Sequence, residues 1–94
     1  MTSNSRIKNG FGLVSNTVLR DPELSIREKG VYSYLATYAD SHDNSLTVSV
    51  NRIASECGIT QSTVKRILES LVNKKVIARE KRMSMQSYRT VLLK

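Results

Sequence analysis

The sequence has few of the residues from which active sites and disulfide-stabilised folds are built. Its 94 residues include one cysteine, Cys57, and one histidine, His42. A single cysteine excludes an internal disulfide and a multi-cysteine zinc site. Neither a Gly-rich phosphate loop nor a cluster of carboxylates is present. The sequence therefore predicts a binding module that is not an enzyme and needs no cofactor or metal.

The sequence also lacks long apolar segments. No apolar run approaches the ~20 residues that a membrane span requires, and residues 1–9 do not contain the apolar core of a signal peptide. Hydrophobic residues make up 39% of the chain and charged residues 24%, which is typical of a globular protein. We expect a cytoplasmic protein with a flexible arm at residues 1–9 and one domain at residues 10–94.

Basic residues are concentrated in the last third of the chain. Fifteen lysines and arginines against eight acidic residues give a net charge of +7. Residues 1–59 carry six basic and six acidic groups, whereas residues 60–94 carry nine basic and two acidic groups. This asymmetry indicates a polyanionic partner that contacts the C-terminal part. The alternatives are a basic face that only maintains solubility, and an acidic membrane surface, for which no basic amphipathic helix with aromatic anchors is present.

The spacing of apolar residues predicts a first helix at about residues 25–41. Ser25 and Glu28 have the spacing of a capping box at its start. A stripe with helical spacing follows, consisting of Val31, Tyr34, Leu35, Tyr38 and Ala39. Gly30 predicts a close approach to another helix, because glycine otherwise destabilises a helix by roughly 1 kcal/mol. Before this helix, Phe11–Leu19 is expected to be a short strand or extended segment.

Two more helices are predicted close together, at about residues 49–57 and 60–74. Ser49 and Thr60 are their expected N-caps, and Gly58 stands where the first would end in the left-handed conformation. Each has one apolar stripe: Val50, Ile53, Ala54 and Cys57 on the first, and Val64, Ile67, Leu68 and Leu71 on the second. A short helix, a glycine turn and a longer helix are typical of a helix-turn-helix. The alternative is an ordinary helical hairpin.

The end of the chain predicts a β-hairpin at about residues 76–93. Two β-prone runs, Val76–Glu80 and Tyr88–Leu93, flank a polar, basic connection. A hairpin after a helix-turn-helix is interpreted as a wing, and Leu46–Val48 is a candidate third strand. The predicted fold class is α+β: a winged helix-turn-helix with three helices and a small antiparallel sheet.

With the stripes buried, the third helix presents a polar face of a size that fits the DNA major groove. The residues expected to read base edges are Gln61, Ser62, Lys65 and Arg66. Glu69 is expected to form an ion pair with Lys65 or Arg66. The residues expected to contact phosphates, at helix starts and on the wing, are Ser49, Thr60, Thr63, Arg79, Lys81, Arg82 and Arg89. Arg6 and Lys8 are either a minor-groove arm or disordered.

The remaining residues that carry chemistry have simpler interpretations. Cys57 is expected to be a small core residue, and His42 to lie in a solvated turn. Tyr34 and Tyr38 are expected in the core, which leaves Tyr32 as a weak basis for a stacking platform. Tyr32 and Ala36 are candidates for a contact surface in a homodimer on DNA.

Two segments of the chain resemble a known family. They are FGLVSNTVLRDPELSIREKGVYSYLATYAD and LTVSVNRIASECGITQSTVKRILESLVNKKVIARE, and they are similar to the winged helix-turn-helix domains of bacterial phage and plasmid proteins. Many of these domains are N-terminal parts of replication initiators, and others are small regulators on mobile elements. The resemblance spans about residues 10–90.

The resemblance implies sequence-specific binding of double-stranded DNA, in plasmid or phage replication initiation or in transcription regulation. The helix with Gln61, Ser62, Lys65 and Arg66 would read the duplex, with Lys81 and Arg82 on the wing. Initiators of this kind usually continue into another domain, so a further C-terminal domain or replication proteins are candidate partners. The alternatives are a protein-interaction module on the same scaffold, and a non-specific DNA-binding accessory factor of plasmid transfer or partition.

Overall fold

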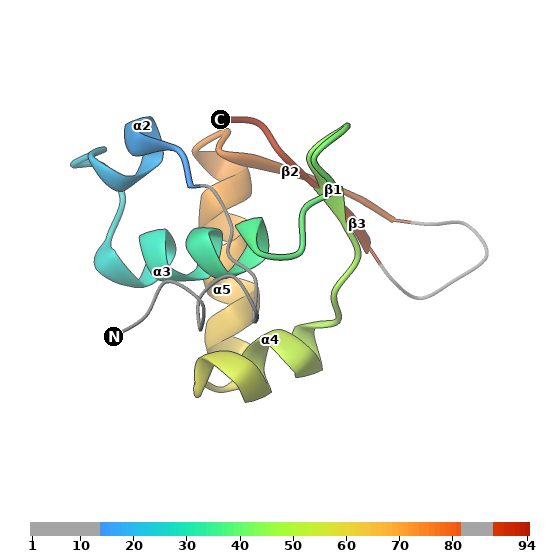
Figure 1. Cartoon of the computed structure of the whole chain (residues 1–94). Helices are drawn as coiled ribbons and strands as arrows, with labels where there is room; N and C mark the ends of the chain where they lie inside the picture. The colour runs from blue at the N-terminus through green and yellow to red at the C-terminus, as the bar shows by residue number, and fades with distance from the viewer. Residues whose placement is uncertain (1–13, 82–87) are drawn as a thin grey trace, which may run out of the picture.

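The computed structural model describes residues 14–81 and 88–94, with only the backbone described at Lys81. The predicted arm at residues 1–9, which includes Arg6 and Lys8, and the predicted wing residue Arg82 lie outside this range. The described elements in chain order are α2 Asn16–Leu19, α3 Ile26–Ala36, β1 Ser45–Leu46, α4 Val50–Cys57, α5 Gln61–Asn73, β2 Ile77–Lys81 and β3 Tyr88–Leu92 (Figure 1).

The first described element, α2, is helical rather than extended. The Ser15 hydroxyl caps it by accepting a hydrogen bond from the Val18 amide. Val18 is buried in the core. The expectation of a strand or extended segment is therefore wrong for residues 16–19. A serine N-cap and the burial of one valine outweigh the β-propensity of a four-residue segment.

Helix α3 begins where the sequence predicts and ends five residues earlier. Its capping box is present: the Ser25 hydroxyl accepts from the Glu28 amide at 3.1 Å, and a Glu28 carboxylate oxygen accepts from the Ser25 amide at 2.7 Å. Instead of continuing to residue 41, the helix ends at Ala36. The Thr37 hydroxyl then donates to the Tyr34 carbonyl, a bond that competes with continuation of the helix.

The buried stripe of α3 differs from the predicted one at Tyr32. Its side chain is 1% exposed, and its hydroxyl donates to the carbonyl of Lys94, which ties the C-terminus to α3. Tyr32 is therefore not available for a stacking platform or a dimer contact. Tyr38, which was expected in the core, lies beyond the end of α3 and is 37% exposed. The contact with a chain end 62 residues away has no counterpart in local spacing.

The expected close approach at Gly30 is also wrong. A Cβ placed on Gly30 would have no neighbouring atom within 4 Å. The space beside this glycine is instead an open hollow between α3, the end of α4 and α5.

The three strands form an antiparallel sheet in the order β1-β3-β2. The hairpin pairs Ile77 with Leu92 and Arg79 with Thr90, and Ser45 of β1 pairs with Val91. Ile77, Thr90 and Leu92 are buried on one face of this sheet. The predicted hairpin is thus confirmed, and the predicted third strand lies at Ser45–Leu46 rather than at Leu46–Val48.

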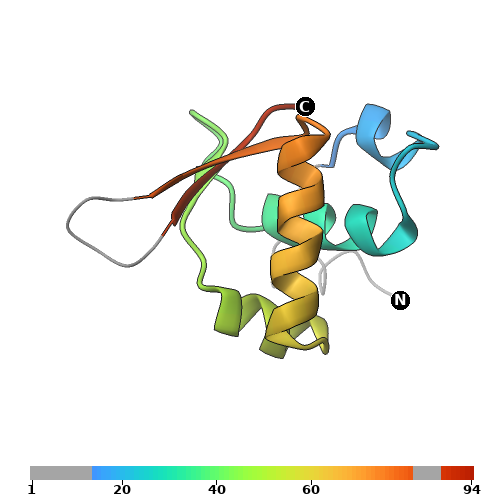
Figure 2. The same cartoon turned by 180° about the vertical axis from the view of Figure 1, so that it is seen from behind.

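Helix α5 lies in the centre of the molecule and contacts α3, α4 and β2. Figures 1 and 2 both show the hairpin on one side of α5, with α2 and the first turn of α3 on the other. The predicted winged helix-turn-helix of class α+β is confirmed, with four helices rather than three in the described range. No helix in this part of the chain is long and apolar enough to cross a membrane.

Candidate nucleic-acid interface

The ends of α4 and the start of α5 are set by three residues that the sequence singles out. The Ser49 hydroxyl accepts from the Arg52 amide at 3.1 Å at the start of α4. Gly58 ends α4 in the left-handed region, with φ 71°. The Thr60 hydroxyl accepts from the Thr63 amide at 3.2 Å and starts α5. All three predicted caps are confirmed, and the N-cap of α5 lies two residues after the glycine that ends α4.

Helix α5 presents one buried and one exposed face. The four residues of its predicted stripe, Val64, Ile67, Leu68 and Leu71, are all buried. The residues predicted to face DNA are all exposed: Gln61, Ser62, Lys65 and Arg66, together with Glu69. In Figure 2 this helix, coloured yellow to orange, is nearest the viewer with no element in front of it. The exposed face is therefore accessible to a large ligand.

The first turns of α4 and α5 are linked by a hydrogen bond that the sequence analysis missed. The Gln61 side-chain amide donates to the side-chain oxygen Oδ1 of Asn51 at 3.2 Å, and both residues are exposed. This bond places Asn51 beside the predicted base-reading residues. Its only signal in the sequence is a polar residue two positions after the Ser49 cap.

The three hydroxyl residues assigned to phosphates lie at the two helix starts. Ser49 and Thr60 are engaged as caps, and the Thr63 hydroxyl lies 2.9 Å from that of Thr60. Thr63 is half-buried. Helix starts of this kind favour anions, because their first amides lack intrahelical partners.

Arg79 lies on the face of the hairpin that continues the buried face of the sheet. Its guanidinium carbon is 4.3 Å from the centre of the Tyr88 ring, and its Nε is buried without a hydrogen-bond partner. Burial lowers the pKa of Arg79, and the neighbouring Tyr88 partly opposes this shift. No carboxylate among the described residues pairs with this arginine. An incoming anion would therefore meet a charge that is not yet neutralised.

Arg89 lies on the opposite face of the hairpin, and its charge is balanced within the protein. It forms ion pairs with Glu80 at 2.8 Å and with Asp43 at 3.4 Å. Hydrogen bonds from the Ser45 hydroxyl and amide, together with Arg89, hold the pKa of Asp43 below its usual range. Arg79 and Arg89 were assigned the same role from the sequence, but the structure places them in different electrostatic environments.

The structure also changes the expected distribution of charge on and next to α5. The expected ion pair of Glu69 with Lys65 or Arg66 is absent among the described salt bridges. Lys74, whose side chain is 38% exposed, pairs with the buried Glu28 at 3.0 Å, so its charge is balanced within the protein. The basic excess at the surface is therefore carried by fewer residues than the sequence suggests.

Cys57 and His42, which lie outside the exposed face of α5, have surroundings typical of residues without a chemical role. Cys57 is half-buried at the end of α4, and burial raises the pKa of its thiol, which disfavours the reactive thiolate. His42 is exposed in a turn, where its amide donates to Asp40 at 2.7 Å. Within residues 14–81 and 88–94, no group of three or more histidine, cysteine or acidic side chains is arranged to hold a metal ion.

Comparison with known proteins gives a family match and two structural relatives. A family model described as a helix-turn-helix domain matches residues 23–77, from just before α3 to the start of β2. No curated protein sequence matches the chain. Two solved structures share the fold: a Rep–DNA complex with a TM-score of 0.69, and the N-terminal domain of a DNA-binding protein with a TM-score of 0.70. Each is 14% identical, and each alignment covers 100% of this chain and 82% of the other.

Proposed function

The chain belongs to the helix-turn-helix domain family, and we propose that it binds double-stranded DNA with α5 in the major groove. The observation that carries this proposal is the exposed polar face of α5, which is held on a buried stripe and has the hairpin beside it. A helix of this diameter fits the major groove, where each base pair has a distinct pattern of donors and acceptors.

We propose that the first two turns of α5 read base edges. Lys65 and Arg66 can donate to guanine O6 and N7, and Gln61 can pair with adenine N6 and N7. Ser62 reaches either a base or a phosphate. The hydrogen bond from Gln61 to Asn51 reduces the rotamer freedom of Gln61 before DNA arrives, which lowers the entropy cost of binding.

We propose that phosphates are bound at two places beside this helix. Ser49, Thr60 and Thr63 mark the helix starts, where backbone amides face the DNA backbone. On the hairpin the candidates are Arg79, Lys81, Arg82 and Arg89. Among these we give Arg79 the larger role and Arg89 the smaller one, because Arg89 would first have to leave Glu80 and Asp43.

The biological role that fits best is sequence-specific recognition in plasmid or phage replication initiation, or in transcription regulation, in the bacterial cytoplasm. The fold shared with a Rep–DNA complex supports the replication role. Binding as a homodimer on repeated half-sites, and attachment to a further domain, are extensions of this proposal.

The test is a titration of the domain with duplex DNA at two salt concentrations. One duplex has a random sequence, and the other carries a sequence selected by the domain from a random pool. A preference of at least about 10³ for the selected duplex, with affinity that falls steeply as salt rises, is expected for a specific reader. Equal binding to both duplexes would indicate a non-specific accessory factor, and no binding at low salt would overturn DNA binding altogether.

A further inference from the structure

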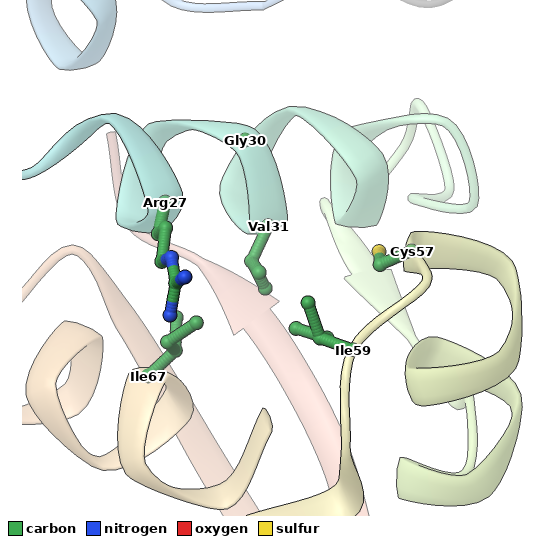
Figure 3. Close-up of a pocket in the computed structure, with 6 residues that line it drawn as sticks. All are labelled: Arg27, Gly30, Val31, Cys57, Ile59 and Ile67. Carbon is green, nitrogen blue, oxygen red and sulfur yellow. The ribbon is translucent and has the colours of Figure 1, made fainter. Parts of the chain in front are cut away.

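Arg27 lies near the start of α3 and extends its side chain toward α5. Figure 3 shows the guanidinium directed across the gap between the two helices, close to Ile67. The side chain borders two open hollows, each of about 270 Å³. One is apolar and is lined by Gly30, Val31, Cys57, Ile59 and Ile67. The other, called the polar hollow below, is lined mostly by residues with polar side chains, which are Ser25, Glu28, Thr63, Arg66 and Ser70, together with Ile67.

The polar hollow holds an excess of positive charge. Its one carboxylate, Glu28, is already paired with Lys74 at 3.0 Å and accepts hydrogen bonds from the Ser25 amide and the Ser70 hydroxyl. Arg27 and Arg66 therefore have no carboxylate partner among the described residues. The guanidinium of Arg27, with hydroxyls beside it and the positive charge of Arg66 at the border of the hollow, forms a surface suited to a phosphate.

The hollow also lies where a DNA backbone would pass if α5 enters the major groove. Thr63, Arg66 and Ser70 follow one another along the flank of α5 that faces α3, next to the exposed face of α5. The hairpin with Arg79 lies on the other side of α5 (Figures 1 and 2). A helix in the major groove has a phosphate backbone on each side, and elements outside the groove commonly contact these backbones.

We propose that Arg27 binds a backbone phosphate of the DNA strand opposite the one contacted by the hairpin. This inference rests on the proposed DNA-binding function. Arg27 is then the third phosphate-binding place of the interface, after the helix starts and the hairpin, and α5 is held in the groove from both sides. Because Arg66 borders the same hollow, this phosphate lies next to the base pair that Arg66 reads, and Arg27 sets the depth and register of α5.

The first experiment compares two variants of α3 that lose the same charge. Arg27→Met keeps an apolar stem over Ile67, so it retains the packing and removes only the guanidinium. Lys29→Met removes one charge two residues further along, from a side chain that lines neither hollow. We expect Arg27→Met to weaken binding to selected and random duplexes equally, by about tenfold. The slope of log K against log salt should become shallower by about 0.9. Lys29→Met should change affinity less than twofold.

The second experiment identifies the phosphate. Neutral methylphosphonate linkages are introduced singly along the selected duplex, and the affinities of the unchanged protein and of Arg27→Met are measured. One linkage should weaken binding by the unchanged protein about tenfold and leave Arg27→Met unaffected, because that contact is already lost. If Arg27 had only a structural role, no single linkage would lose its effect in the Arg27→Met variant.

Three outcomes would decide the inference. Equal affinities and salt slopes for the two methionine variants would overturn the contact at Arg27, while leaving DNA binding by the unchanged protein intact. The contact at Arg27 would also be overturned if no methylphosphonate linkage weakened binding by the unchanged protein while leaving Arg27→Met unaffected. Failure of the unchanged protein to bind duplex DNA would instead overturn the proposed function, on which the contact depends.

Discussion

Arg79 stacks on Tyr88, with its guanidinium carbon 4.3 Å from the ring centre, on the face of the hairpin that continues the protein core. The two residues are diagonal neighbours across β2 and β3, because Arg79 pairs with Thr90 and Lys81 with Tyr88. On the other face, Arg89 is the direct cross-strand partner of Glu80 and forms an ion pair with it. The two faces therefore differ in available charge, since the aromatic ring holds Arg79 in place without neutralising it.

The contrast between these two arginines is testable by substitution. Arg79→Met should weaken binding to every duplex by about tenfold and change thermal stability little, because its Nε makes no hydrogen bond that would be lost. Arg89→Met should leave DNA affinity nearly unchanged and cost less than about 1 kcal/mol of stability, as expected for surface ion pairs. Affinity at two salt concentrations and a melting curve for each variant provide the check. Similar losses of affinity for both variants would contradict the assignment.

Arg66 and Lys81 should differ in a second way if α5 reads bases and the hairpin binds phosphates. Arg66→Ala should cost ~1–3 kcal/mol on the selected site and relax the sequence preference at one base pair. Lys81→Ala should weaken selected and random duplexes equally and make the salt slope shallower. Binding measured across duplexes with single base changes distinguishes the two effects. If both variants keep the same sequence preference, the division between base reading and phosphate binding is wrong.

The buried Glu28 should make the folding stability of the protein depend on pH in the acidic range. Burial raises the pKa of its carboxyl, but hydrogen bonds from Ser25, Ser70 and Lys74 outweigh burial and lower the pKa from 4.5 to about 2. Between these values the unfolded state binds the proton more readily than the folded state. Up to about 3 kcal/mol of stability, complete above about pH 4.5, is therefore lost as the pH falls toward 2.

Urea unfolding from pH 2 to pH 7 tests this dependence. Glu28→Gln should be less stable by about 2 kcal/mol at pH 7. Its stability should also fall less than that of the unchanged protein as the pH is lowered from 4.5 toward 2, because glutamine does not titrate. Glu69→Gln, which removes an exposed carboxylate on α5, serves as the control. Parallel acid curves for the unchanged protein and Glu28→Gln would show that another group is responsible.

The two described glycines should respond to alanine in opposite directions. Gly30 lies inside α3 with open space where a Cβ would be, so Gly30→Ala should stabilise the fold by roughly 0.5–1 kcal/mol. Gly58 also has open space, but its φ of 71° is left-handed, so Gly58→Ala should destabilise by about 1–2 kcal/mol. Gly58→Asn should recover part of that loss, because asparagine tolerates this region. Thermal or urea unfolding gives the sign, and destabilisation by Gly30→Ala would mean that the hollow beside α3 is filled.

Features with short-range causes could be predicted from the sequence. The caps at Ser25, Ser49 and Thr60 each depend on a hydroxyl and an amide three residues later, and the turn at Gly58 depends on one residue's backbone freedom. The buried stripe of α5 follows from its helical period. The exposed face, with the predicted base-reading residues, is simply the remainder of that helix. Its location was therefore predictable before the tertiary structure was known.

Features that join distant parts of the chain could not be predicted in this way. Tyr32 is buried in the core with its hydroxyl donating to the carbonyl of Lys94, 62 residues away, and the charge of Lys74 is balanced because it meets Glu28, 46 residues away. Short α2 also depends on tertiary contacts, since four residues do not form a stable helix alone.

The sequence alone determined that this protein has a helix-turn-helix, a following hairpin and a basic last third, because these properties follow from local spacing and composition. The tertiary structure alone decided which of the basic residues keep an available charge. Arg89 is neutralised by Glu80 and Asp43, whereas Arg79 is held by an aromatic ring and Arg27 faces a hollow that already has a paired carboxylate. The physical reason is that electrostatic interaction depends on separation in space, and local spacing in the sequence contains no information about which distant charges will meet.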